Sequence, residues 1–254
     1  MAQWLAEERE DLSFPHTHGE DSDIRIAYCP ERILPGKVIS ELIDNDRVIG
    51  GMTKSCSDAA IEVYKVFVKG NCMSTDTRTA EMIKLTENAS RDVNIALANE
   101  LSIICDELGI DVWEMINLAN NHPRVNILQP GPGVGGHCIA VDPWFIVAES
   151  PNNANLIKEA RRINDNKPNW VTEKVKVIIQ NIILEKEKNS PEDITVACYG
   201  LSFKANIGDL RESPAVSIVS KILKMRLGKV LIVEPNIEEL PNQLKEAELT
   251  GFSD

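Results

Sequence analysis

Residues 194–233 read ITVACYGLSFKANIGDLRESPAVSIVSKILKMRLGKVLIV, and this stretch indicates the fold class. An apolar strand over 194–199 leads into a helix over 213–226, and a second strand follows over 229–233. Strand, helix and strand in this order open a doubly wound parallel sheet. The sequence therefore predicts a Rossmann-like α/β domain over 188–254, and we expect it to be partial because the chain stops soon after the second strand.

The amino-terminal part contains further pieces of an α/β layer. Short apolar runs over 24–28 and 47–51 predict two strands, and apolar residues at helical spacing over 57–69 predict a helix. These pieces are too few to cover both faces of a parallel sheet. We therefore expect residues 1–75 to be the remnant of an amino-terminal Rossmann domain, with sequence missing upstream.

Between these two parts the pattern is helical. A run over 79–108 has neither proline nor glycine and ends at Gly109, the residue type that most often terminates a helix. Asp111 is suited to cap a second helix. A third helix is expected over 152–187, with a kink or break at Lys167-Pro168. We therefore predict an all-helical central domain over residues 76–187.

Charge and hydropathy exclude some classes of protein. The 254 residues include 27 basic and 39 acidic side chains, and the net charge of −12 argues against a general nucleic-acid surface. No apolar run approaches the ~18–20 residues that span a bilayer, and the acidic start MAQWLAEERED differs from a signal peptide. We expect no membrane association.

Cysteine usage indicates the compartment. Six cysteines are spread along the chain without a CxxC pair: Cys29, Cys56, Cys72, Cys105, Cys138 and Cys198. Such spacing does not resemble a disulfide framework, so reduced thiols in the cytoplasm are expected.

The segment Gly131-Pro-Gly-Val-Gly-Gly136 matches the dinucleotide fingerprint G-x-G-x-x-G literally. The fingerprint joins a strand to a helix, with an acidic residue about 20 positions later. Here Pro130 and Pro132 stiffen the segment, and His137-Cys138 follows it. We favour a loop whose bare backbone lets a ligand approach closely and which presents Cys138 at its end.

Other chemistry-bearing residues have two interpretations each. Cys138 is either an exposed nucleophile or, as is usual for cysteine, a small buried residue, which is how we interpret the other five cysteines. A zinc site of His122, His137 and Cys138 is conceivable, but its spacing matches no known zinc frame, and we expect no metal. Lys84, Asn88 and Arg91 share one helix face, which is either functional or simply solvated.

Four stretches together resemble the UDP-glucose/GDP-mannose dehydrogenase family over almost the whole chain. They are CPERILPG (29–36), AEMIKLTENASRDVN (80–94), NILQPGPGVGGHCIAVDPWF (126–145) and GLSFKANIGDLRESP (200–214). The third stretch, with the HPRVN that leads into it, is most similar to the branch that acts on UDP-N-acetyl-D-mannosamine. That branch makes the uronic acid of enterobacterial common antigen. The resemblance begins partway into the family's first domain and stops within its last.

The resemblance implies a homodimeric enzyme with an NAD-binding Rossmann domain, a helical middle and a UDP-binding Rossmann-like domain. Such enzymes oxidise the C6 alcohol of a UDP-sugar to a carboxylate in two NAD-dependent hydride transfers. By similarity Cys138 is the nucleophile that forms a thiohemiacetal and then a thioester. Lys84 matches the lysine that polarises the C6 oxygen, and Asn88 its companion. Asp142 matches the aspartate of thioester hydrolysis, and it is also expected to hold Lys84.

The same resemblance implies a set of binding residues. Those expected to bind the UDP-sugar, besides Lys84 and Asn88, are Arg32, Ile33, Arg91, His122, Arg124, Gly135, Phe203 and Lys204. Arg211 is expected to contact NAD. Pro35 stands where relatives acting on UDP-glucose have a second glutamate, which disfavours UDP-glucose as substrate.

Three other functions remain open. The chain could be an inactive remnant that only dimerises through its helical middle, because it lacks sequence matching the family's NAD fingerprint. It could be a UDP-glucose-type 6-dehydrogenase. A hydrolytic or acyl-transferring cysteine enzyme would need a histidine base near Cys138, and His137 is adjacent in sequence and poorly placed to face it.

Overall fold

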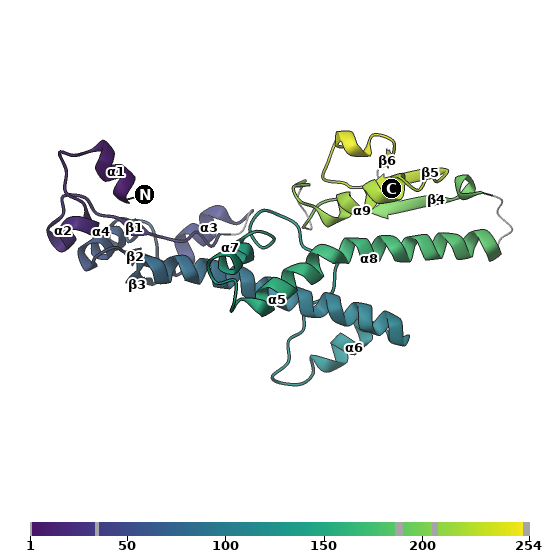
Figure 1. Cartoon of the computed structure of the whole chain (residues 1–254), viewed down its shortest axis with the longest axis horizontal. Helices are drawn as coiled ribbons and strands as arrows, with labels where there is room; N and C mark the ends of the chain where they lie inside the picture. Colours follow the sequence, from purple (N-terminus) through teal and green to yellow (C-terminus); the bar gives the residue numbers. More distant parts are fainter. Residues whose placement is uncertain (1, 34–35, 186–189, 205–207, 251–254) are drawn as a thin grey trace. The chain divides into compact units, whose positions relative to one another are not determined.

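The structure, a computed structural model, describes residues 2–33, 36–185, 190–204 and 208–250. It divides into two units, Met1–Glu87 and Asn88–Asp254. The α/β class is confirmed, since each unit has a small sheet with parallel strands and covering helices (Figure 1). The three-part division at 75/76 and 187/188 stays a prediction.

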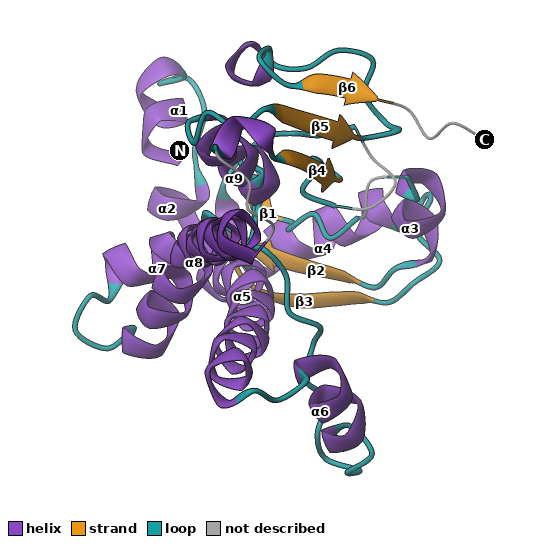
Figure 2. Ribbon diagram, turned by 90° about the vertical axis from the view of Figure 1, so that its right-hand side faces the viewer, coloured by secondary structure: helices purple, strands orange, loops and turns teal. Residues whose placement is uncertain are grey.

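The first unit is built on a sheet of three strands in the order β1 (Ala27–Tyr28), β2 (Arg47–Gly51) and β3 (Cys72–Asp76). β1 pairs antiparallel with β2, and β2 pairs parallel with β3. The helices are α1 (Ala2–Glu8), α2 (Pro15–His18), α3 (Val38–Asp44) and α4 (Lys54–Tyr64). All five residues of β2 are buried, so this strand is the centre of the layer (Figure 2).

Prediction of this unit was partly correct. β2 has the expected bounds, but the strand expected over 24–28 is regular only at Ala27–Tyr28. The helix expected over 57–69 begins earlier, because the Thr53 side chain accepts a hydrogen bond from the Cys56 N–H and caps it, and it ends at Tyr64. β3 was not predicted. Its sequence CMSTD has no residue in the buried class, so it lacks the apolar pattern of a strand.

Two long helices, α5 (Thr77–Leu108) and α8 (Asn155–Glu185), carry most of the central region. α5 begins in the first unit and ends in the second, where Gly109 follows it. Gly109 has a φ of 67°, which glycine adopts without strain because it has no Cβ. The Ile110 N–H bonds the Cys105 carbonyl at 2.8 Å, a Schellman ending. As predicted, Asp111 caps α6 (Val112–Ala119) by accepting from the N–H groups of its first turn.

We expected a kink or a break at Lys167-Pro168. α8 is continuous, so the break is wrong, and the kink stays a prediction. Proline removes only one intrahelical hydrogen bond. The residues on its N-terminal side, Asn164 and Lys167, are buried, and Thr172 on its C-terminal side is buried too, so packing keeps the helix continuous across the defect. No helix in the described ranges is both long and apolar enough to cross a membrane.

The carboxyl-terminal sheet has the parallel order β4 (Thr195–Tyr199), β5 (Lys229–Val233) and β6 (Glu248–Thr250), which Figure 2 shows side by side. α9 (Pro214–Leu223) connects the first two strands, as predicted, and Ser213 caps it. The buried core of this layer consists of Leu201, Val216, Ile218, Val219, Ile222, Val230, Ile232 and Leu244.

Candidate active site

The first unit organises a loop after β1 around one glutamate. The Glu31 carboxylate accepts a hydrogen bond from the buried Arg47 guanidinium at 3.0 Å. The same oxygen accepts the backbone N–H groups of Arg32 and Ile33, at 2.7 and 3.0 Å. Because three donors converge on one oxygen, the backbone of this loop is held in one conformation.

Lys84 of α5 reaches this loop. Its Nζ donates to the Glu31 carbonyl at 2.8 Å. One turn further along α5, Glu87 forms an ion pair with Arg32 at 2.9 Å. The structure therefore brings together the predicted residues Arg32, Ile33 and Lys84. Pro35, whose position disfavoured UDP-glucose, lies outside the described residues.

In the second unit, Cys138 lies in a turn that leads into α7 (Asp142–Glu149). Its carbonyl accepts the N–H groups of Val141 and Asp142, at 3.0 and 2.8 Å. The cysteine is half-buried, which leaves part of it accessible. The Asp142 carboxylate accepts a hydrogen bond from the Asn88 amide at 2.5 Å. Three predicted catalytic residues of this unit are thus linked. Asn88 bonds the Asp142 side chain, and the Asp142 N–H bonds the Cys138 carbonyl.

The glycine loop, residues 131–138, runs between α6 and α7, so neither side of it is a strand. This confirms that G-x-G-x-x-G is not a dinucleotide fingerprint here. A Cβ built on Gly135 would lie 2.6 Å from the Phe203 Cβ and 2.7 Å from the Glu212 carbonyl. The Gly136 N–H donates to the Arg211 carbonyl at 3.2 Å, and its Cα faces the Phe203 ring. These two positions therefore require glycine, because other residues of the protein pack closely against the loop backbone there.

Arg211 places a positive charge near the thiol. Its guanidinium pairs with Asp209 at 2.6 Å, and it is close enough to Cys138 for an electrostatic interaction. The hydrogen bonds from Arg211 hold the pKa of Asp209 at about 2, and His137 contributes a smaller attraction. Asp209 therefore stays ionised and orients the exposed guanidinium of Arg211, whose backbone carbonyl accepts the Gly136 N–H two residues before Cys138.

Glu234, directly after β5, anchors the loop that carries Phe203. Its carboxylate accepts the N–H groups of Leu201 and Ser202, at 2.9 and 3.0 Å. Burial disfavours the charged form, but these hydrogen bonds and two from Asn236 outweigh it, and the pKa of Glu234 falls to about 2. The loop is thus pinned by a permanent charge. Lys204, the next predicted binding residue, is exposed.

Other predicted residues lie apart from this cluster. Arg91 is exposed on α5, and His122 and Arg124 are exposed in the turn that follows α6. In the described parts of the chain, no hydrogen bond or ion pair joins these three to the glycine loop. The zinc alternative also lacks support there, since the described residues contain no cluster of three metal-binding side chains.

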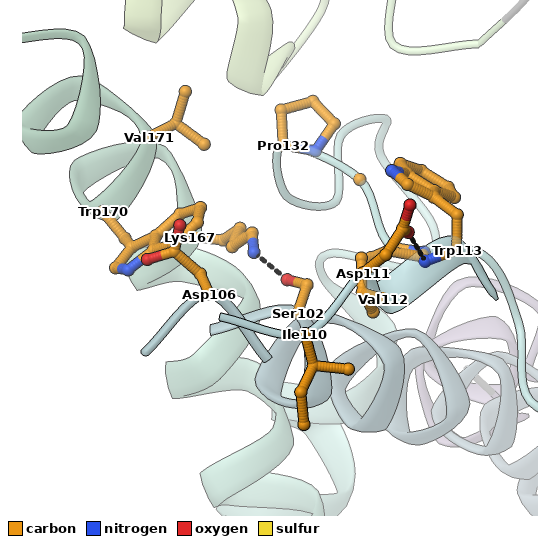
Figure 3. Close-up of a pocket in the computed structure, with 12 residues that line it drawn as sticks. Ser102, Asp106, Ile110, Asp111, Val112, Trp113, Pro132, Lys167, Trp170 and Val171 are labelled. Carbon is orange, nitrogen blue, oxygen red and sulfur yellow. Dashed lines mark hydrogen bonds between the residues drawn. The ribbon is translucent and has the colours of Figure 1, made fainter. Parts of the chain in front are cut away.

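Two cavities flank the glycine loop. One of about 740 Å³ is lined by His137, Arg161, Glu212 and Lys221, among others. The second, of about 600 Å³, lies at the beginning of the loop and is lined by Gly131, Trp113 and Trp170 (Figure 3). On its floor the Lys167 Nζ points to the Ser102 hydroxyl. Burial lowers the pKa of Lys167 to about 8, against the attraction of Asp106.

Three residues of the site were not predicted. Arg47, Asp209 and Glu234 each fix a predicted residue or its loop. A signal existed for Glu234, because an acidic residue after the second strand of a βαβ unit is a recognised position for a functional carboxylate. No sequence pattern distinguishes Arg47 or Asp209 from ordinary surface charges.

Comparison with known proteins supports a single family across the chain. Three models of the UDP-glucose/GDP-mannose dehydrogenase family match it in order. They are its NAD binding domain over residues 1–68, its central domain over 78–166 and its UDP binding domain over 197–254.

Individual relatives agree. The chain is 62% identical to a UDP-N-acetyl-D-mannosamine dehydrogenase of Campylobacter jejuni, over 96% of this chain and 58% of that protein. It is 60% identical to an NDP-N-acetyl-D-galactosaminuronic acid dehydrogenase of Ralstonia nicotianae, over 98% and 57%. A solved UDP-D-ManNAc dehydrogenase from Pyrococcus horikoshii superposes with a TM-score of 0.79 at 38% identity, covering 93% of this chain and 55% of that one. The chain thus spans less than two thirds of these relatives.

The Gly135→Ala substitution tests whether the loop depends on bare backbone. Its methyl group would overlap Phe203 and the Glu212 carbonyl, so we expect a loss of about 1–3 kcal/mol in the free energy of unfolding. Gly131→Ala is the matched control, because no described atom lies within 4 Å of its added Cβ. Urea denaturation measures both. Equal stability of the two variants would contradict the packing described here.

Proposed function

This chain belongs to the UDP-glucose/GDP-mannose dehydrogenase family, and we propose that it oxidises the C6 alcohol of UDP-N-acetyl-D-mannosamine to the uronate with NAD. The observation that carries the proposal is the convergence of Asn88, Asp142 and Arg211 on the turn that bears Cys138. A half-buried thiol at the end of a fixed glycine loop is suited to covalent catalysis on a carbonyl.

In the proposed reaction the first oxidation removes two electrons from C6 and gives an aldehyde. The Cys138 sulfur then adds to the aldehyde carbon, and the former carbonyl oxygen becomes the hydroxyl of a thiohemiacetal. Loss of a second hydride and of the hydroxyl proton gives a thioester. Water adds to that carbon, the C–S bond breaks, and the carboxylate leaves with the thiol restored. NAD, when bound, accepts the two hydrides.

Lys84 is proposed to stabilise negative charge on the C6 oxygen. Its ammonium donates to the Glu31 carbonyl, a bond that orients the side chain and leaves further N–H donors for substrate. A preorganised cation beside a developing oxyanion lowers the barrier, since it needs no reorganisation during reaction. Whether Lys84 approaches Cys138 stays a prediction, as does its contact with Asp142.

Asp142 is proposed to orient the hydrolytic water. One carboxylate oxygen accepts the Asn88 amide, which fixes the rotation of the group. The second oxygen then points in a defined direction from the first turn of α7, next to the cysteine. Asn88 therefore acts on hydrolysis through Asp142 as well as on substrate.

The remaining predicted residues would bind the two ligands. We propose that Phe203 and Gly135, which pack on one another, and Lys204 contact the UDP moiety from the carboxyl-terminal layer. Arg32 and Ile33 would contact the sugar nucleotide from the first unit, and Arg91, His122 and Arg124 supply further charge and polarity.

Arg211 fits a cofactor bearing phosphates, because Asp209 holds its exposed guanidinium in place and its backbone bonds the glycine loop at Gly136. In the first unit, carboxylates accept hydrogen bonds from backbone N–H groups at the starts of α4 and α5, the helices that follow β2 and β3. Glu20 accepts the N–H groups of Lys54 and Ser55, and Asp76 accepts that of Thr79. These two helix starts are therefore occupied by carboxylates, and we propose Arg211 as one contact to NAD.

The setting follows from the same proposal. We propose a cytoplasmic enzyme that serves surface polysaccharide synthesis, namely of enterobacterial common antigen, and note that all six cysteines are unpaired. We also propose a homodimer. Apolar side chains lie exposed at the end of α5, on α6 and in the connection between them: Ile104, Leu108, Ile110, Trp113 and Leu118. Water-exposed apolar surface of this kind favours association.

Turnover distinguishes the proposal from its alternatives. With the purified chain, NAD and UDP-N-acetyl-D-mannosamine, we expect two NADH per sugar, and a lower kcat/KM with UDP-glucose. Cys138→Ser should lower kcat at least about 100-fold, because a serine hydroxyl, unlike a thiol, stays almost entirely protonated near neutral pH and is a far poorer nucleophile. Cys72→Ser, a half-buried cysteine on β3, is the control. No NADH with any sugar would favour an inactive dimerising chain, and higher kcat/KM with UDP-glucose would assign that substrate.

Lys84→Ala tests the role of the ammonium group. We expect kcat to fall by about 10²–10³-fold, the range seen when one oxyanion donor is lost, with a smaller change in KM. Steady-state kinetics with varied UDP-sugar measures both constants. An unchanged kcat with a raised KM would restrict Lys84 to substrate binding.

Leu118→Glu tests the proposed homodimer. A charge in the apolar face of α6 should raise the dimer dissociation constant at least about tenfold, because a carboxylate cannot be buried there without cost. Sedimentation equilibrium measures it, and Glu114→Gln on the same helix is the control. A chain that is monomeric without any substitution would contradict the dimer.

A further inference from the structure

We propose that Asn99 of α5 is a positioning residue that fixes the start of the glycine loop and thereby the presentation of Cys138. This inference takes one point from the proposed function, the catalytic role of Cys138. Asn99 is fully buried, and both ends of its side-chain amide are used. Its Oδ1 accepts the Gly131 N–H at 2.8 Å, and its Nδ2 donates to the Asn164 side chain at 2.9 Å.

The direction of this chain of hydrogen bonds is set by chemistry. A backbone N–H only donates, so the atom of Asn99 that faces Gly131 must be the oxygen. Its NH₂ group must then face the Asn164 oxygen. The Asn164 NH₂ group in turn donates to the Asp92 carboxylate at 2.8 Å and to the Asp92 carbonyl at 3.1 Å. Neither amide can flip without facing donor to donor or acceptor to acceptor.

A buried ion pair terminates the chain of amides. The Arg161 guanidinium bonds the Asp92 carboxylate at 2.6 Å, and both side chains are almost completely shielded from water. Since Asp92 and Asn99 lie on α5 while Arg161 and Asn164 lie on α8, the network sets the position of one helix along the other. The glycine loop is attached to this fixed frame through Asn99.

A second contact secures the loop at Gly133. Pro168 of α8 has no N–H, so the Asn164 carbonyl lacks its usual partner four residues later. A Cβ on Gly133 would lie 3.2 Å from that carbonyl oxygen and 3.3 Å from the Pro168 ring, and Gly133 has a φ of 139°. The loop backbone at Gly133 therefore packs directly against the proline defect of α8. Gly133 lies two residues after Gly131, which bonds Asn99.

The later half of the loop is held from the other side. Gly135 and Gly136 pack on Phe203, and the Gly136 N–H bonds the Arg211 carbonyl. Cys138 follows two residues later. Loss of the Asn99 bond would free the first anchor while leaving the second, so the thiol should shift or become mobile without global unfolding.

The experiment compares two ways of breaking the same bond. Asn99→Leu keeps the branched shape of the side chain and removes the acceptor, whereas Gly131→Pro keeps the helix network and removes the donor. Gly131→Ala retains the N–H and is the matched control for the proline variant. Ser102→Ala, one turn along α5, removes a buried hydroxyl that bonds Lys167 and controls for general loosening of the helix pair.

Two readouts need no turnover. Mass spectrometry follows alkylation of Cys138 by iodoacetamide, and hydrogen exchange follows peptides covering residues 129–138. We expect Asn99→Leu and Gly131→Pro to change the alkylation rate of Cys138 by about threefold to tenfold, in line with one lost hydrogen bond. Exchange in the loop should accelerate similarly in Asn99→Leu. Gly131→Ala and Ser102→Ala should leave both readouts within twofold.

Kinetics separate the positioning role from the proposed function. If the chain turns over, Asn99→Leu should lower kcat more than it raises KM for the UDP-sugar. If no variant turns over, the proposed function fails, and the alkylation and exchange data still decide the positioning role. Unchanged alkylation in both bond-breaking variants, or equal changes in Ser102→Ala, would overturn it. Should Asn99→Leu fail to fold, Gly131→Pro carries the test.

Discussion

The buried pair of Arg161 and Asp92 is the constraint on which the second unit depends. Breaking such a pair by removing one partner typically costs about 3–5 kcal/mol, because the other charge is left without compensation. The pair need not stabilise the fold by itself, since apolar residues of the same volume would often do as well. Its effect is geometric. Charged partners and directional amides permit one alignment of α5 with α8, whereas an apolar seam would tolerate several.

That alignment extends to the cysteine through backbone rather than through side chains. Asn99 accepts a hydrogen bond from Gly131, and Gly133 packs against the proline defect of α8. Gly135 and Gly136 pack against Phe203. Glu234, ionised at any ordinary pH, holds the loop that supplies Phe203. The glycines are therefore packing positions for protein, arranged so that Cys138 leaves the loop in a defined direction. In the first unit Glu31 has the same function for Arg32 and Lys84, with Arg47 as its buried counter-charge.

Sequence reasoning succeeded where a residue acts on its own neighbours. Gly109 ends α5, and Asp111 caps the helix that follows it, because these effects are set within one turn of chain. The parallel pair β4 and β5 followed from apolar runs around a helix. It failed at β3, whose residues are largely exposed, and at Pro168, where burial on both sides overrides the proline. The same limit applies to the predicted site residues. The resemblance identified which residues they are, but only contacts between distant segments show which of them lie close together.

By itself the sequence determined the α/β class, the helices α5, α6, α8 and α9, the strands β2, β4 and β5, and the identity of the family, because propensity, capping and motif order are carried by local chain. Only the tertiary structure decided which polar residues are buried. On α5, Asp92 and Asn99 are polar residues of the kind expected on a solvent-exposed helix face. Arg91 is indeed exposed, yet Asp92 and Asn99 are buried. The physical reason is that the cost of burying a charge or amide depends on whether a partner meets it, and the partners Arg161 and Asn164 come from a helix some 70 positions away.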